Sequence, residues 1–199
     1  MAKKKYYAVR KGRERGIFTD WETCKAQVQG FPGADFKGFV SLEEAQAYLG
    51  KTQDPGPKDL GEGDLVAYVD GSYNQADQSY AYGVLLIHPQ GQEETYSQRF
   101  NREDMREMRN VAGELEGAKL AMARARDLGA KTLYLHYDYL GIEKWALGEW
   151  KRNKKGTQDY KAYYDQIKED LKVVFIKVPA HSGVEGNERA DLLAKEAKF

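Results

Sequence analysis

A run of glycine, proline and charged residues interrupts this 199-residue chain at KTQDPGPKDLGEG, over residues 51–63. Proline and glycine break helices and strands, and this run lacks the apolar periodicity of a packed element. We therefore expect a linker at 51–63, which separates a small module at 1–50 from a larger domain at 64–199.

The composition, with 41% hydrophobic and 31% charged residues, is typical of a soluble globular protein. No stretch approaches the roughly 20 apolar residues of a transmembrane helix, and the basic start MAKKKYYAVRKG lacks the apolar segment of a secretory signal. The single cysteine, Cys24, excludes an intrachain disulfide and is expected to be a buried thiol. These features predict a cytoplasmic protein without a membrane span.

The small module shows the pattern of a compact α+β unit. Strands are expected at YYAVR, IFT and FPGADFKGFV, and helices at DWETCKAQVQG and SLEEAQAYLG. Asp20 and Ser41 are residue types that cap helix N-termini, and Ser41 with Glu44 has the spacing of a capping box. Gly30 and Gly50 suit the ends of the two helices.

The larger domain is predicted to be α/β, with a mixed five-stranded sheet and flanking helices. Strands are expected at LVAYV, AYGVLLIH, EETYSQRF, TLYLHY and KVVFIKV. A helix is expected at residues 110–128, where apolar residues recur on one stripe from Val111 to Leu128. Further helices are expected at about 140–150, at 158–170 and at NERADLLAKEA. This order of elements favours a sheet with helices packed on its faces.

Four acidic residues stand where an expected strand or helix begins, ends or turns inward. They are Asp70 in AYVDGSY, Glu114 in VAGELEG, Asp138 in LHYDYLGI and Asp191 in NERADLLAKEA. A carboxylate in apolar surroundings is costly unless it is paired or holds a metal, and converging carboxylates suit hard divalent cations. Asp70 and Asp138 are each expected to end a strand, where α/β sheets gather ligands. The pattern favours a metal-dependent phosphodiesterase.

Other kinds of site find little support in the sequence. It contains no cysteine cluster, and the three histidines, His88, His136 and His181, are too scattered for a zinc centre. His88 and His136 are expected to be structural. The phosphate-binding pattern of a P-loop is absent, which argues against a nucleotide triphosphatase.

The formal net charge is +0, which argues against a general binder of polyanions. Two basic clusters nevertheless stand out, one within residues 1–15 and the other at Lys151, Arg152, Lys154 and Lys155. They predict two contacts with one polyanion. The alternative is that both clusters are simply solvated.

Several short motifs of the larger domain resemble those of a type 1 ribonuclease H, and they follow one another in the same order. They are VDGS, the Glu of the helix after three strands, DYLGI, and AHSG followed by the Asp of GNERAD, over about residues 64–198. In the module, YYAVRKGRERGIF, Trp21 and GFPGADFKGF resemble the hybrid-binding, viroplasmin-like domain that precedes the catalytic domain in many such enzymes. The resemblance implies an RNase H-like fold and an endoribonuclease that hydrolyses the RNA strand of RNA/DNA hybrids, leaving 5′-phosphate and 3′-hydroxyl ends.

The resemblance also implies which residues act in catalysis. The family's carboxylates match Asp70, Glu114, Asp138 and Asp191, which would hold two Mg²⁺ ions, with Mn²⁺ as a substitute. The family's loop histidine matches His181, which would move a proton or help the product leave. A solvated loop histidine is the alternative for His181.

Candidate substrate contacts fall in both parts of the chain. Asn110 matches a substrate-contacting residue of the family, and Gly71 and Ser72 are candidates beside it for reading 2′-hydroxyl groups. Trp145, Trp150 and Lys151 are candidates for the DNA strand, and which tryptophan faces the substrate is left open. In the module, the nucleic-acid-contacting residues of the family match Tyr7, Trp21, Phe36 and Lys37.

The expected partner is an RNA/DNA hybrid, with double-stranded RNA as a second candidate for the module, and the chain is expected to be a monomer. Two rival interpretations stay open. A hybrid-binding protein without catalysis predicts a missing carboxylate, whereas all four are present. Another nuclease core of the wider RNase H-like group, such as a resolvase or transposase, is disfavoured by the module and by the HSG sequence.

Overall fold

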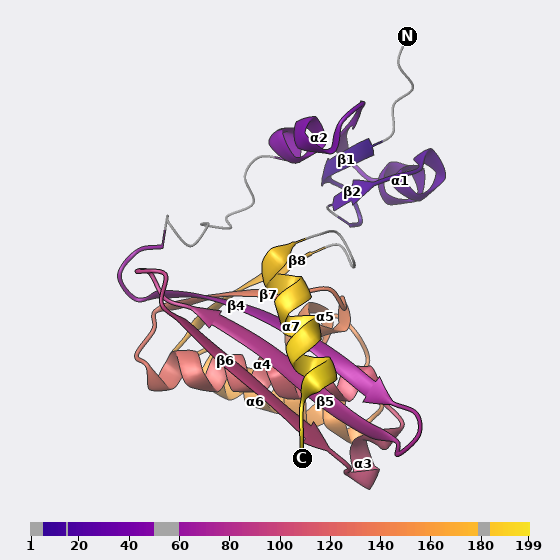
Figure 1. Ribbon diagram of the computed structural model, residues 1–199. Coiled ribbons are helices and arrows are strands. Elements are labelled where there is room, and N and C mark those ends of the chain that lie inside the picture. Colours follow the sequence, from indigo (N-terminus) through magenta and orange to yellow (C-terminus); the bar gives the residue numbers. More distant parts are fainter. Residues whose placement is uncertain (1–5, 15, 50–59, 179–183) are drawn as a thin grey trace. The chain divides into compact units, whose positions relative to one another are not determined.

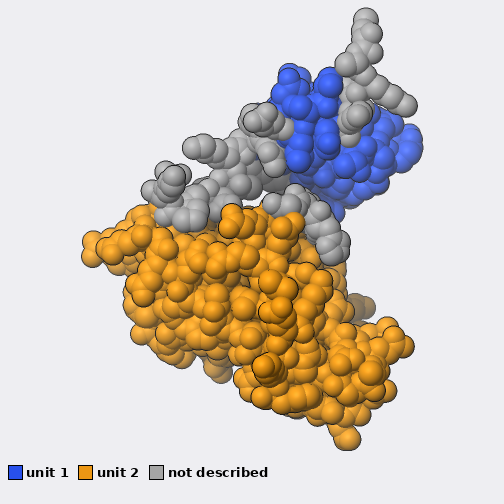
Figure 2. All heavy atoms as spheres, viewed as in Figure 1, with its two compact units in different colours: residues 1–54 blue, residues 55–199 orange. Residues whose placement is uncertain are grey.

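The computed structural model describes residues 6–14, 16–49, 60–178 and 184–199. The chain forms two compact units, which divide between residues 54 and 55 (Figure 2). This division lies inside the segment expected to be a linker. Residues 60–63, at the end of that segment, belong to the larger unit, because Leu60 packs against Val66, Leu85 and Ile87.

The small unit contains a three-stranded antiparallel sheet in the order β2-β1-β3. Its elements are β1 Tyr6–Lys11, β2 Gly16–Phe18, α1 Trp21–Val28, β3 Asp35–Phe39 and α2 Leu42–Leu49. This order confirms the predicted α+β module. The side chains of Val9, Cys24 and Val28 form its core, and Cys24 is fully buried as expected.

Both helices of the small unit begin at the predicted caps. A carboxylate oxygen of Asp20 accepts a hydrogen bond from the backbone N–H of Thr23 at 2.8 Å. The hydroxyl of Ser41 accepts one from the backbone N–H of Glu44 at 3.2 Å. These side chains satisfy backbone donors that the first turn of a helix leaves unpaired.

The larger unit is built on a five-stranded mixed sheet in the order β6-β5-β4-β7-β8 (Figure 1). Its strands are β4 Asp64–Asn74, β5 Ser79–Ile87, β6 Glu93–Phe100, β7 Thr132–Tyr137 and β8 Lys172–Lys177. The first three strands in sequence pair antiparallel, whereas β4, β7 and β8 pair parallel. The predicted mixed five-stranded sheet is confirmed.

Helices cover both faces of this sheet. They are α3 Glu103–Arg106, α4 Asn110–Asp127, α5 Gly141–Ala146, α6 Lys155–Ile167 and α7 Glu185–Glu196. Helix α7 crosses one face, while α4 and α6 lie on the other (Figure 1). The main core lies between α4 and the sheet and includes fully buried Leu115, Leu133 and Leu135.

The structure corrects three details of the sequence prediction. Asp70 lies inside β4 and not at its end, because β4 continues to pair with β5 as far as Asn74 opposite Ser79. The short helix α3 was not expected. Leu128, predicted to lie on the apolar stripe of α4, is 44% exposed because the helix ends at Asp127.

Candidate active site

Three of the four predicted carboxylates converge in the larger unit. Asp70 comes from β4, Glu114 from α4, and Asp138 follows β7 directly. Each offers one oxygen atom, and these oxygens all lie within 4.8 Å of one another. The parallel register of β4 and β7 explains part of this arrangement, since Tyr68 lies opposite His136 and the two aspartates follow two residues later.

Glycine residues explain how Glu114 reaches the other two carboxylates. A Cβ atom on Gly71 would lie 2.2 Å from the carbonyl oxygen of Asn110 and 2.6 Å from the amide nitrogen of Glu114. A Cβ atom on Gly113 would lie 2.0 Å from the carbonyl oxygen of Ala81. Helix α4 can therefore lie directly on β4 and β5 only because both positions lack a side chain.

Two of the three carboxylates, those of Asp70 and Glu114, are buried, and Asp138 is partly buried. Glu114 is 1% exposed and Asp70 is 8% exposed. Burial, together with the charge of Asp138, raises the pKa of Asp70 to about 6, although the backbone N–H of Gly71 donates a hydrogen bond to it at 2.7 Å. Burial and the charges of Asp70 and Asp138 also raise the pKa of Glu114 well above its usual range.

These features fit a divalent cation. The buried Oε2 atom of Glu114 has no hydrogen-bond partner among the described residues. Carboxylate oxygens are the preferred ligands of Mg²⁺ and related hard cations. The positive charge of such a cation compensates the repulsion between the carboxylates. The donor set of Asp70, Glu114 and Asp138 is therefore suited to hold one.

The fourth carboxylate, Asp191 on α7, stands beside this group and not within it. Its Oδ2 atom accepts a hydrogen bond from Nζ of Lys195, one turn further along the helix, at 2.6 Å. The charge of Asp191 contributes to the raised pKa of Asp70. Its side chain is 31% exposed, in contrast to the buried Glu114.

Of the three histidines, His88 and His136 lie within the described residues. His181 lies outside the described residues, so its catalytic role stays a prediction. The Nε2 atom of His88 lies 2.7 Å from a carboxylate oxygen of Glu94. The ring of His136 is 1% exposed and stacks on Tyr68 with centroids 4.3 Å apart. These contacts agree with the structural roles expected for His88 and His136.

The candidate residues for reading the RNA strand lie next to the carboxylates. Gly71 follows Asp70, and Asn110 is the exposed first residue of α4. The hydroxyl of Ser72 points elsewhere: it donates a hydrogen bond to the backbone carbonyl of Ala194 in α7 at 2.6 Å.

An aromatic group lies beside Asp138. The rings of Trp145 and Trp150 have centroids 5.7 Å apart, and Tyr139 lies 5.7 Å and 6.4 Å from them. Trp145 packs partly buried against the core and donates a hydrogen bond from Nε1 to the carbonyl of Lys151 at 3.2 Å. Trp150 is 38% exposed and is the more accessible tryptophan. Tyr139 was not among the residues expected from the sequence to belong to this group, although its position directly after Asp138 was a signal for such a role.

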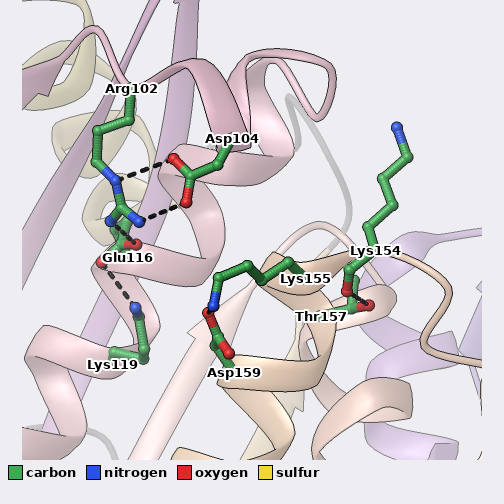
Figure 3. A network of polar contacts seen from close by, with 8 residues as sticks. All are labelled: Arg102, Asp104, Glu116, Lys119, Lys154, Lys155, Thr157 and Asp159. Atoms are coloured by element: carbon green, nitrogen blue, oxygen red, sulfur yellow. Dashed lines mark hydrogen bonds and ion pairs between the residues drawn. The ribbon is translucent and has the colours of Figure 1, made fainter.

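The second basic cluster is partly neutralised. Lys154 pairs with Glu107 at 3.1 Å, and Lys155 pairs with Asp159 at 3.3 Å. Figure 3 shows Lys155 and Asp159 together with a neighbouring network in which Arg102 joins Asp104 and Glu116, and Lys119 joins Glu116. Within the described parts of the chain, Lys151 and Arg152 have no ion-pair partner and are the available cations of this cluster.

The predicted aromatic residues of the small unit form a row. Ring centroids lie 5.5 Å apart for Tyr7 and Trp21 and 5.9 Å apart for Trp21 and Phe36. Trp21 is 41% exposed and Phe36 is 39% exposed, so the row presents ring surface to solvent. Lys37 follows Phe36 directly, with its amine 5.6 Å from the ring of Phe39.

None of the helices in the described ranges is long and apolar enough to cross a membrane.

Comparisons with known proteins agree with this arrangement. The family model of the ribonuclease H1 N-terminal domain matches residues 5–49, and the RNase H model matches residues 62–199. Ribonuclease H1 of Mus musculus is 25% identical over 252 residues, which cover 96% of this chain and 88% of the mouse protein.

Solved structures share the fold of the larger unit. RNase H1 from the halophilic archaeon Halobacterium salinarum has a TM-score of 0.56 at 24% identity, covering 67% of this chain and 96% of the archaeal one. LC11-RNase H1, solved in complex with an RNA/DNA hybrid, has a TM-score of 0.55 at 21% identity, covering 67% of this chain and 95% of its own. Because the RNase H model also spans more than half of the sequence, the chain belongs to the ribonuclease H family.

Proposed function

We propose that this protein is an endoribonuclease that hydrolyses the RNA strand of RNA/DNA hybrids. The observation that carries the proposal is the convergence of Asp70, Glu114 and Asp138, with a buried and unpartnered oxygen on Glu114, in a chain of the ribonuclease H family. The relative LC11-RNase H1, which shares the fold, binds an RNA/DNA hybrid.

The carboxylates would hold two divalent cations, Mg²⁺ with Mn²⁺ as a substitute. Asp70 would contact both ions, Glu114 and Asp138 would complete one ligand set, and Asp191 the other. Cations bound there supply a Lewis acid that activates water and stabilises a leaving oxygen. Because water and not the neighbouring 2′-hydroxyl attacks, the products should carry 5′-phosphate and 3′-hydroxyl ends.

Residues around the carboxylates would select the substrate. The backbone at Gly71 and the side chain of Asn110 would read 2′-hydroxyl groups of the RNA strand across the minor groove. Trp150 and Lys151, with Trp145 supporting them, would contact the DNA strand. The loop residue His181 would move a proton or help the product leave.

The small unit would act as a second binding element. The row of Tyr7, Trp21 and Phe36 would pack on sugars or bases, and Lys37 would meet a phosphate. We propose that residues 1–50 form this module, with a linker at 51–63 and the catalytic domain at 64–199. Double-stranded RNA is a second candidate ligand of the module, and we propose that a monomer suffices for both functions.

The test is cleavage of labelled strands in a hybrid duplex with Mg²⁺, with single-stranded RNA and double-stranded DNA as control substrates. We expect cleavage of the RNA strand of the hybrid only, and end analysis should give 5′-phosphate and 3′-hydroxyl termini. Products with 2′,3′-cyclic phosphates would refute the water-attack mechanism. Tight hybrid binding without any cleavage would favour the rival interpretation of a binding protein.

A further inference from the structure

The C-terminal end of α7, the helix that carries Asp191, is held by one arginine from the edge strand β6. The guanidinium of Arg99 donates hydrogen bonds to the backbone carbonyls of Ala194 at 3.4 Å, Lys195 at 3.2 Å and Ala197 at 2.9 Å. Its backbone N–H donates to the carbonyl of Lys198 at 2.9 Å. The carbonyls of Ala194 and Lys195 belong to the last turn of α7, which a helix leaves without partners, and those of Ala197 and Lys198 follow its end.

Arg99 takes the place of the usual C-terminal cap of a helix. The residue after α7 is Ala197, with φ −58° and ψ 139°, and not a glycine in the left-handed region. The carbonyls of the last turn therefore lack the cap that such a glycine allows. A guanidinium with several donors, and with a positive charge at the negative end of the helix dipole, serves in its place. Its Nη1 atom is itself held by the hydroxyl of Ser79 at 3.1 Å.

Arg99 belongs to a row of residues beneath the last turn of α7. The strand register pairs Ser72 with Ala81 and Ala81 with Arg99, so the three side chains lie on one face of the sheet. The hydroxyl of Ser72 donates to the carbonyl of Ala194, the same oxygen that Arg99 contacts.

The next row on the same face contains Asp70 and its strand partner Gly83. A Cβ atom on Gly83 would lie 2.0 Å from the carbonyl oxygen of Ala190, so α7 contacts the sheet directly beside Asp191. The contact of Arg99 and Ser72 with Ala194 therefore lies one helical turn from Asp191. A shift of α7 along the sheet would move Asp191 relative to Asp70 but would leave Glu114 and Asp138 in place.

We propose that Arg99, assisted by Ser72, is a positioning residue that sets the place of Asp191 opposite Asp70. Its loss weakens the cation site that needs Asp191 and spares the site built from Asp70, Glu114 and Asp138. This inference rests on the proposed function, because it assigns Asp191 to the second of two cation sites.

The test compares Arg99→Met, Arg99→Lys and Ser72→Ala in the full chain. Arg124→Met is the matched control, because Arg124 is another partly exposed arginine with side-chain hydrogen bonds. Its guanidinium lies 2.8 Å from the hydroxyl of Tyr96 and 3.1 Å from a carboxylate oxygen of Glu94, and it contacts no part of α7 in the described structure. Mn²⁺ binding is measured by calorimetry and by electron paramagnetic resonance, and hybrid cleavage is measured over a range of Mg²⁺ concentrations.

For Arg99→Met we expect the weaker of two Mn²⁺ sites to lose about tenfold in affinity, the lower end of the effect of residues that orient metal ligands. The stronger site should not change. The Mg²⁺ concentration for half-maximal cleavage should rise by a similar factor, while the rate at saturating Mg²⁺ recovers most of its wild-type value. Arg99→Lys should recover part of the affinity, Ser72→Ala should lose a few-fold, and Arg124→Met should match the wild type.

Equal Mn²⁺ binding in wild type, Arg99→Met and Ser72→Ala would overturn the positioning role, and so would equal weakening of both sites. If Arg99→Met does not fold, as judged by circular dichroism, Ser72→Ala decides the question, since it removes one hydroxyl. If Arg99→Met loses the weaker Mn²⁺ site but the wild-type protein cleaves no hybrid, the positioning role is supported and the proposed function is refuted. If the wild-type protein cleaves the hybrid but Arg99→Met and Ser72→Ala bind Mn²⁺ as the wild type does, the proposed function is supported and the positioning role is refuted.

Discussion

The two units of this protein place their functional side chains in opposite environments. The larger unit buries carboxylates, with Glu114 at 1% exposure, whereas the small unit exposes aromatic rings, with Trp21 at 41%. A buried carboxylate is destabilising until a cation compensates it, so the larger unit is prepared for chemistry at some cost in stability. An exposed ring has no such cost and offers surface to a ligand. From this contrast we expect that catalysis and binding can be separated by mutation.

The largest separation is expected for Asp138→Asn. The change removes one charge from the carboxylate group with little change in shape. Hybrid cleavage in Mg²⁺ should fall by about a hundred- to a thousandfold, comparable to the loss of an essential electrostatic group. Hybrid binding, measured by fluorescence anisotropy, should stay within a few-fold of wild type because the aromatic row is untouched. Cleavage within tenfold of wild type would mean that Asp138 holds no cation.

A steric change at Gly71 should damage the larger unit alone. In Gly71→Ala, the new methyl group would meet backbone atoms of α4 at 2.2 Å and 2.6 Å, so the helix that carries Glu114 must move. We expect a loss of about 1–3 kcal/mol in the free energy of unfolding, typical of overpacking, and about a hundredfold loss of cleavage, typical of a misplaced catalytic group. The control is Gly16→Ala in the small unit, where the nearest atom would lie 3.7 Å away. Near-normal cleavage by Gly71→Ala would show that close contact of α4 is dispensable.

The cost of the buried carboxylates can be measured without substrate. The pKa of Asp70 is raised in the folded protein from 3.8 to about 6, so the folded state binds a proton more tightly than the unfolded state. The associated stability is fully present below about pH 4 and is lost as the pH rises to about 6. Metal-free Asp70→Asn should therefore be more stable than wild type at pH 7, by up to about 3 kcal/mol.

Thermal unfolding at pH 4 and pH 7, with and without Mg²⁺, checks this expectation. The advantage of Asp70→Asn should shrink at pH 4, and added Mg²⁺ should stabilise the wild type but not the variant. A variant that is less stable than wild type at pH 7 without metal would contradict the electrostatic cost assigned to Asp70.

The smallest effect is expected from the exposed row. Trp21→Ala removes ring surface without changing charge, so binding to a long hybrid should weaken by about tenfold, within the range of one stacking contact. Cleavage of a hybrid of about 12 base pairs should change little, because a short duplex cannot occupy both units. Phe199→Ala is the control, since Phe199 is 74% exposed in the larger unit. Equal effects on short and long hybrids would argue against a separate binding element.

Much of the local structure could be predicted from the sequence because its signals are local. The caps at Asp20 and Ser41 bond within three residues of their own position. The apolar stripe of α4 and the places of the five strands along the chain follow from short-range periodicity. Periodicity failed at Leu128 because a stripe does not show where a helix ends, and it missed α3 because a single turn has almost no period.

The sequence by itself determined the two-part organisation, the elements of each part except α3, the family motifs and the identity of the three carboxylates that meet. Only the tertiary structure decided that Asp70 lies within a strand, that Gly71 and Gly113 let α4 rest on the sheet, and that three carboxylates meet within 4.8 Å. It also decided that Arg99 holds the end of α7 at Ala197, which lies 98 residues further along the chain. The physical reason is that such contacts depend on the distance between backbones in the packed state, whereas a sequence pattern reports only which face of its own element a side chain occupies.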